Sequence, residues 1–184
     1  MEIETPRLLL RQFVPSDAER LFEIYSDPVT MRFMGRGPET VDDERNALER
    51  HIEIYYNAHG YGLFGVVLKD ENKLVGRCGI VRQEIDGETR GELSYLIDRP
   101  YWGRGIATEA AQKVVELAPI KFCLESLIAL ILPDNTGSMR VATKCGFEFE
   151  RRLPEFKIWK DVGLYSKSLV GTSEAISHHV PSKI

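Results

Sequence analysis

The first third of the chain changes from a strand-like to a helical spacing of apolar residues. Residues 7–13 are rich in leucine and end in phenylalanine, which indicates a strand. Pro, Ser and Asp at 15–17 come just ahead of apolar residues at helical spacing, so we predict a first helix that Pro28 ends. Thr40 and Asp43 have the spacing of a capping box and predict the start of a second helix.

The middle of the chain is rich in β-forming residues and turn signals. Residues 61–68, 74–81 and 91–97 are three strand-like runs. Asp86 and Gly87, between the last two runs, form a dipeptide that is favoured in hairpin turns. We therefore predict an antiparallel meander.

The last third alternates helical and strand-like segments. Small and apolar residues recur at helical spacing over 105–117, and Pro119 is predicted to end this helix. Gly146 occupies the position that typically follows a helix, so a short helix is expected before it. The remaining predicted segments are a buried strand at 126–132, this short helix from 135 to 144, and two closing strands at 147–152 and 157–165.

This order of elements predicts one domain over residues 1–169. The fold class is α/β (α+β), with a mixed, mostly antiparallel central sheet of about seven strands flanked by about four helices. The length of 184 residues agrees with a single domain. Residues 170–184 lack periodicity, and we expect them to form a flexible C-terminal tail.

Composition narrows the classes of protein that the chain can belong to. Hydrophobic residues make up 43% and no apolar run approaches a membrane span, so we expect a soluble protein without membrane contact. The amino terminus is acidic where a secretory signal is basic, which favours the cytoplasm. The net charge of −4 argues against nucleic-acid binding. Three widely spaced cysteines and scattered histidines predict neither a disulfide framework nor a metal site.

The segment after the third strand of the meander combines glycines with the start of a helix. Such a turn presents unpaired backbone N–H groups and the positive end of the helix dipole, which together bind anions. The spacing fits neither a mononucleotide P-loop nor a dinucleotide-binding G-x-G-x-x-G motif, because Thr108 and Ile106 stand at the deciding positions. The residues that we expect to hold a diphosphate are Gly103, Arg104, Gly105, Ile106, Ala107 and Thr108.

Two segments resemble the GNAT acetyltransferase superfamily. Residues 102–110, Trp-Gly-Arg-Gly-Ile-Ala-Thr-Glu-Ala, resemble its coenzyme A pyrophosphate loop, although Trp102 stands where Gln or Arg is usual. Residues 135–147 resemble its Asn-x-x-Ala/Ser helix that ends in Gly-Phe. With Thr-Pro-Arg-Leu-Leu-Leu at 5–10 and Lys-Asp at 160–161, the chain resembles the branch of ribosomal-protein alanine N-acetyltransferases over about residues 3 to 169.

The resemblance implies N-acetylation with acetyl-CoA as cosubstrate and no metal, by direct attack of a primary amine in a ternary complex. It implies a bulged strand at 91–97 that splays from the strand at 126–132, the fourth and fifth strands of the predicted sheet, so that the pantetheine arm can pair with backbone groups of Tyr95, Leu96 and Ile97. Glu92 is the candidate general base, since the family often places a carboxylate at the start of this strand. Asn135 would cap its helix and touch the pantetheine, and Ser138, one helical turn later, would assist the departing thiolate.

The family's usual general acid, a tyrosine seven residues after the asparagine, is replaced by Ala142. Ser138, solvent, Tyr95 or Tyr165 remain as alternatives. The acceptor is open between a protein amino terminus and a small-molecule amine, and the oligomer between monomer and homodimer. A non-catalytic acyl-CoA-binding regulatory module and a nucleotide-binding regulatory domain are the competing functions. Without a role in catalysis or binding, Glu92 would be an ordinary strand glutamate, Asn135 a helix cap and Ser138 a helical serine.

Overall fold

The computed structural model describes residues 1–170 and contains one sheet of eight strands. The strands lie in the order β1-β2-β3-β4-β5-β6-β8-β7, and every neighbouring pair is antiparallel except β5 and β6. The bounds are β1 Glu2–Glu4, β2 Leu8–Arg11, β3 Leu63–Leu68, β4 Lys73–Ile85, β5 Glu88–Ile97, β6 Ser126–Ile131, β7 Glu148–Phe156 and β8 Trp159–Ser168. The predicted mixed, mostly antiparallel sheet is confirmed. The tail expected at 170–184 lies, apart from its first residue, outside the described residues.

The sheet has one strand more than the sequence predicted. The additional strand is β1, in which Ile3 is buried and pairs with Leu10 of β2. Three residues are too few for an alternating pattern to stand out, so β1 could not be recognised from its own sequence.

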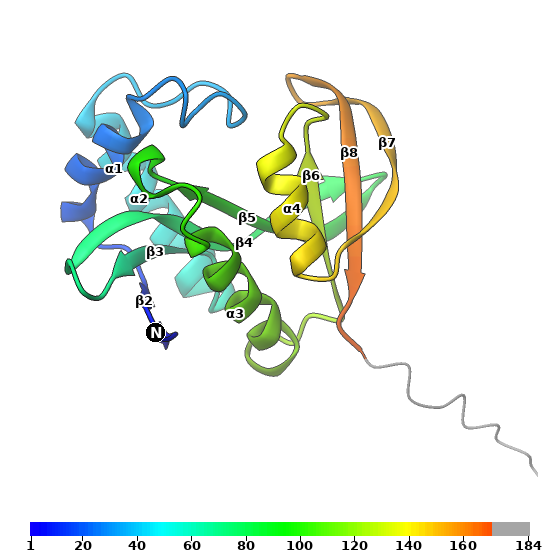
Figure 1. Cartoon of the computed structure of the whole chain (residues 1–184), viewed down its shortest axis with the longest axis horizontal. Coiled ribbons are helices and arrows are strands. Elements are labelled where there is room, and N and C mark those ends of the chain that lie inside the picture. The colour runs from blue at the N-terminus through cyan, green and yellow to red at the C-terminus, as the bar shows by residue number, and fades with distance from the viewer. Residues whose placement is uncertain (171–184) are drawn as a thin grey trace, which may run out of the picture.

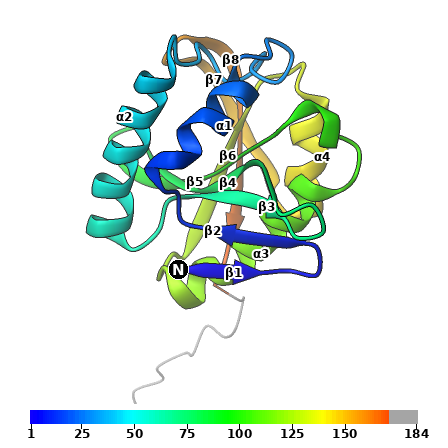
Figure 2. The same ribbon diagram turned by 90° about the vertical axis from the view of Figure 1, so that its left-hand side faces the viewer.

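Four α-helices cover the two faces of the sheet (Figures 1 and 2). Figure 2 shows α1 and α2 side by side, and Leu21 of α1 and Leu48 of α2 share one core with Leu96 of β5. Val114 of α3 belongs to the core on the other face. No helix formed by residues 1–170 is long and apolar enough to cross a membrane. The bounds are α1 Ala18–Tyr25, α2 Val41–His51, α3 Ile106–Lys121 and α4 Thr136–Lys144, with short helical segments at Pro15–Asp17, Ile52–Asn57 and Arg99–Tyr101.

Pro119 does not end α3, contrary to the prediction. The helix continues to Lys121, and Phe122 caps it by donating its backbone N–H to Ala118 O. Proline removes one backbone hydrogen bond but is tolerated here, because buried Val115, Ala118 and Phe122 hold the last turn against the sheet.

The sheet splays between β5 and β6, as predicted for its fourth and fifth expected strands. These two strands are paired at only one position, Glu92 with Ile128, whereas β6 and β8 pair along the whole of β6. In Figure 1 the half made of α1, α2 and the first strands therefore separates from the half made of β6, β7, β8 and α4. Beyond Glu92, β5 has a free edge.

The bulge expected in the strand at 91–97 is absent. The β4–β5 register runs without a shift from Gly76 opposite Ile97 to Ile85 opposite Glu88. Asp86 and Gly87 close this hairpin with positive φ angles of 53° and 82°, a turn that matches the twist of the strands and requires no extra residue. The splay therefore comes from the divergence of β6 and not from an irregularity of β5.

Candidate active site

The turn ahead of α3 leaves a row of backbone amides without partners. Gly103 and Gly105 have φ angles of 76° and 78°, in the left-handed region that glycine adopts at little cost. A Cβ at Gly103 would meet no atom within 4 Å, so the backbone angle, and not a lack of space, favours glycine there. Within residues 1–170, no acceptor receives a hydrogen bond from the backbone N–H groups of residues 103–108. The start of α3 therefore fits the diphosphate of coenzyme A.

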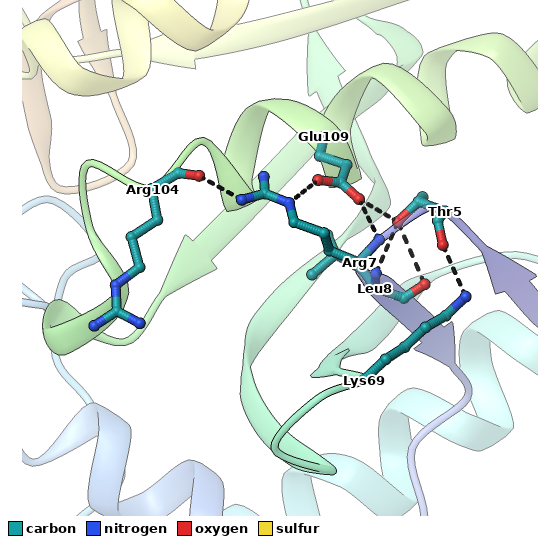
Figure 3. A network of polar contacts seen from close by, with 6 residues as sticks. All are labelled: Thr5, Arg7, Leu8, Lys69, Arg104 and Glu109. Carbon is teal, nitrogen blue, oxygen red and sulfur yellow. Dashed lines mark hydrogen bonds and ion pairs between the residues drawn. The ribbon is translucent and has the colours of Figure 1, made fainter.

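A polar network ties this turn to the amino-terminal hairpin (Figure 3). Arg7 donates from Nη1 to the backbone oxygen of Arg104 at 2.9 Å and from Nε to Glu109 Oε2 at 2.7 Å. Thr5 Oγ1 donates to Glu109 Oε1 at 2.6 Å, and these hydrogen bonds help to hold the pKa of Glu109 below its ordinary value, although its partial burial acts in the opposite direction. The Thr-Pro-Arg segment that the sequence analysis noted only as a resemblance thus holds the glycine turn in place.

A cavity of about 300 Å³ lies where β5 and β6 diverge. Four of the predicted site residues line it: Glu92 and Tyr95 of β5, and Asn135 and Ser138 at the start of α4. The side chains of Leu96 and Ile97 do not line it, because they are buried in the cores on opposite faces of the sheet. Backbone groups of alternate residues point to the free edge of β5 and can pair with a ligand, and Ile97 O already accepts a hydrogen bond from Trp102 Nε1 at 2.6 Å.

Glu92 sits at the one position where β5 still touches β6. Its carboxylate accepts a hydrogen bond from Gln83 Nε2 at 2.5 Å, and Gln83 Oε1 in turn accepts one from Lys157 Nζ at 2.8 Å. Burial raises the pKa of Glu92 to about 6, while the Gln83 hydrogen bond and the charges of Lys157 and Arg77 lower it by less. A carboxylate with this pKa is ionised at neutral pH and is a stronger base than an ordinary glutamate.

Ser138 at the start of α4 and Tyr95 of β5 bring two hydroxyl groups to the cavity. Asn135 caps α4 as predicted, since its Oδ1 accepts a hydrogen bond from Ser138 N at 3.1 Å. The Tyr95 hydroxyl donates to Ser138 O at 3.0 Å. Burial raises the pKa of Tyr95 well above its ordinary value, so the hydroxyl keeps its proton at any working pH.

The structure separates the two tyrosines that were left open as general acids. Ala142, at the family's tyrosine position, is fully buried in the core. Tyr165 packs its ring against Phe149 at a centroid distance of 5.5 Å and is not among the cavity residues, whereas Tyr95 is. Of the candidates that the sequence left open, Ser138 and Tyr95 therefore line the cavity, as does the hydroxyl-bearing Ser94 of β5.

The sequence analysis missed Arg77, Gln83 and Lys157, which also line the cavity. A signal for Gln83 was present, because the Asp86-Gly87 turn fixes the register and places Val81 opposite Glu92. Gln83, two residues along β4, then shares the face of Glu92. No comparable signal exists for Lys157, whose hairpin comes next to β4 only through the tertiary fold.

Comparisons with known proteins identify the family of this chain. The family model described as "Acetyltransferase (GNAT) domain" matches residues 7–148. The uncharacterized N-acetyltransferase YnaD of Bacillus subtilis (strain 168) is 30% identical over 170 residues, which cover 90% of this chain and 96% of that protein. A GNAT-family acetyltransferase structure from Bacillus anthracis has a TM-score of 0.75 at 32% identity and covers 92% of this chain and 99% of that one.

A ribosomal-protein-S5-alanine acetyltransferase structure from Vibrio fischeri has a TM-score of 0.79 at 21% identity, covering 91% of this chain and 96% of that one. This likeness is one of fold. The chain belongs to the GNAT acetyltransferase family, and it is an acyltransferase.

Proposed function

We propose that the protein transfers an acetyl group from acetyl-CoA to a primary amine, by direct attack in a ternary complex. The observation that carries this proposal is the row of unpartnered amides at 103–108, which lies one turn beyond the free edge of β5 and its cavity. The acceptor is a protein amino terminus or a small molecule that carries an amine.

The donor is held mainly by the backbone. The amides of Gly103, Arg104, Gly105, Ile106, Ala107 and Thr108 bind the diphosphate, helped by the dipole of α3. The free edge of β5 at Tyr95, Leu96 and Ile97 pairs with the pantetheine arm as an added strand would, and Asn135 lies beside it. A backbone N–H of this edge that faces the thioester carbonyl would contribute about 3 kcal/mol to the transition state.

Glu92 prepares the acceptor by removing a proton from its ammonium group. Its pKa of about 6 keeps it ionised at neutral pH and brings it closer to the pKa of an α-amine than an ordinary glutamate would be. The bond from Gln83 orients the carboxylate and still leaves its second oxygen available to the amine.

Ser138 and Tyr95 stabilise the departing thiolate in the cavity. The Ser138 hydroxyl can donate a hydrogen bond to sulfur, and the Tyr95 hydroxyl, which keeps its proton, can do so when it gives up its bond to Ser138 O. Tyr95 supplies the tyrosine hydroxyl that is missing at position 142, and it reaches the site from β5 and not from α4.

The test has two measurements on the full chain. Calorimetry should show saturable acetyl-CoA binding, and a panel of primary amines, including peptides with different first residues, should release coenzyme A. Ala142 favours one second candidate, a non-catalytic acyl-CoA-binding module, which predicts binding without release. Absence of saturable binding would end both ideas.

A further inference from the structure

Arg77 of β4 places a charged side chain in the cavity wall, and one of its donors, Nε, has no hydrogen-bond partner within residues 1–170. Its Nε is buried and forms no hydrogen bond with any described residue. No ion pair within 4 Å joins Arg77 to a carboxylate of residues 1–170; instead its guanidinium lies over the ring of Tyr25, with Cζ 5.1 Å from the centroid. Such a buried donor is unfavourable unless a ligand satisfies it.

Two buried acids feel the charge of Arg77. Glu44 of α2 is buried, and this burial raises its pKa to about 7 although the charge of Arg77 acts against the rise. Glu92 is the second acid that feels the charge of Arg77. Neither acid forms an ion pair within 4 Å of the guanidinium in the described residues, so Arg77 is open to an anion from outside the protein.

Arg77 and Glu92 share one face of the sheet. Val81 lies opposite Glu92, and Arg77 is four residues before Val81 on the same strand, so both point to the α1 and α2 side. Lys157 adds a second cation, since its Nζ reaches Gln83 and its charge lowers the pKa of Glu92. One wall thus carries a candidate base flanked by two positive charges.

This wall selects against a simple ammonium ion, because two cations repel it before it reaches Glu92. We propose that the acceptor is an amine that also carries a carboxylate, with Arg77 as its specificity-determining residue. The planar guanidinium matches a carboxylate, and this pairing offsets the repulsion of the amine. The inference rests on the proposed acetyl transfer, and it names the substrate class of that site.

The test uses matched pairs of acceptors that differ only in the acid. One arm compares ω-amino acids with alkylamines of the same length, a second compares α-amino acids with their amides, and a third compares C-terminally amidated peptides that have Glu or Gln at the second residue. The three arms distinguish a free amino acid from an acidic peptide amino terminus. Wild type should prefer the carboxylate member of at least one pair by roughly ten- to hundredfold in kcat/KM.

Arg77→Met should reduce this preference to near unity and leave the KM for acetyl-CoA unchanged. Arg77→Lys, which keeps the charge but loses the planar fork, should retain part of the preference. Arg82→Met is the matched control, because Arg82 is an exposed arginine of the same strand that does not line the cavity; it should keep the full preference. If circular dichroism shows that Arg77→Met does not fold, the test is decided by Arg77→Lys, through its ratio of kcat/KM for the acidic and the neutral amine.

Equal turnover of acidic and neutral amines by wild type would overturn the inference, and so would an unchanged preference in Arg77→Met. Preference for phosphoethanolamine over ethanolamine, with none for a carboxylate, would overturn it as well. These failures leave acetyl-CoA binding and turnover intact. Failure of the proposed function itself is distinguishable, because it would abolish donor binding or coenzyme A release with every amine.

Discussion

On the proposed donor side, residues 103–108 offer backbone amides from one short, continuous segment ahead of α3. On the acceptor side, Arg77, Glu92 and Lys157 offer side chains from β4, β5 and the β7–β8 hairpin. A backbone site depends on glycines and a helix start, and it tolerates many side chains around it. A side-chain site changes its selectivity with a single substitution. The difference explains how one family can keep its donor while its members use different acceptors.

The largest effect is expected on the acceptor side. Glu92→Gln removes the proposed base and should lower kcat/KM by about 10²- to 10⁴-fold with acetyl-CoA affinity retained. In wild type, kcat/KM should fall as the pH drops through about 6, because protonation of Glu92 removes the base. Glu84→Gln, an exposed acid on the same hairpin, should change neither quantity. A pH profile of Glu92→Gln that still falls near pH 6 would show that another group is the base.

A comparable loss is expected on the donor side, but in binding. Gly105→Glu places a side chain at a φ of 78° and an acid beside the diphosphate, so acetyl-CoA affinity should drop by roughly a hundredfold. Gly87→Glu is the matched control, since Gly87 has a φ of 82° in a hairpin turn outside the cavity. Gly87→Glu should lose a similar amount of folding stability and keep its full affinity for acetyl-CoA, as measured by calorimetry. Equal affinity in both variants would contradict the position of the diphosphate.

A smaller effect tests the support of the glycine turn. Arg7→Met breaks the hydrogen bonds to Arg104 O and Glu109, and the KM for acetyl-CoA should rise about tenfold while kcat changes little. Lys69→Met is the control, because Lys69 bonds to Glu4 and Thr5 of the same hairpin without touching the turn. Steady-state kinetics in which both variants raise KM equally would reduce the role of Arg7 to general stability.

The smallest expected effect concerns the hydroxyl groups of Ser138 and Tyr95. Ser138→Ala and Tyr95→Phe should each lower kcat several-fold with unchanged KM, if each donates one hydrogen bond to the leaving thiolate. Thr143→Ala removes a hydroxyl of the same helix that bonds only to Met139 O, and it should leave kcat unchanged. Should neither Ser138→Ala nor Tyr95→Phe change kcat, the proton would have to come from solvent.

The local structure of the proposed donor side could be predicted from the sequence because it depends on neighbouring residues. Gly103, Gly105 and the helix that follows are contiguous, and the cap at Asn135 is a three-residue pattern. The Asp86-Gly87 turn likewise fixed the meander, and with it the position of Glu92 opposite Val81. These features need only short-range geometry.

The acceptor side could not be predicted in the same way. Arg77 and Lys157 are 80 positions apart in the sequence, and only the packing of the β7–β8 hairpin near β4 brings both to the cavity. The short strand β1 and the continuation of α3 past Pro119 were missed for a related reason. In β1 and at the end of α3, burial in the tertiary structure determines the secondary structure, and the local sequence does not reveal it.

The most direct test of the account is a titration of ¹⁵N-labelled protein with coenzyme A, followed amide by amide in NMR spectra. Binding of the diphosphate at the start of α3 predicts that the largest downfield shifts occur at the backbone amides of residues 103–108, with Gly103 and Gly105 among them. Saturable binding that leaves these amides unshifted and moves others would contradict the account.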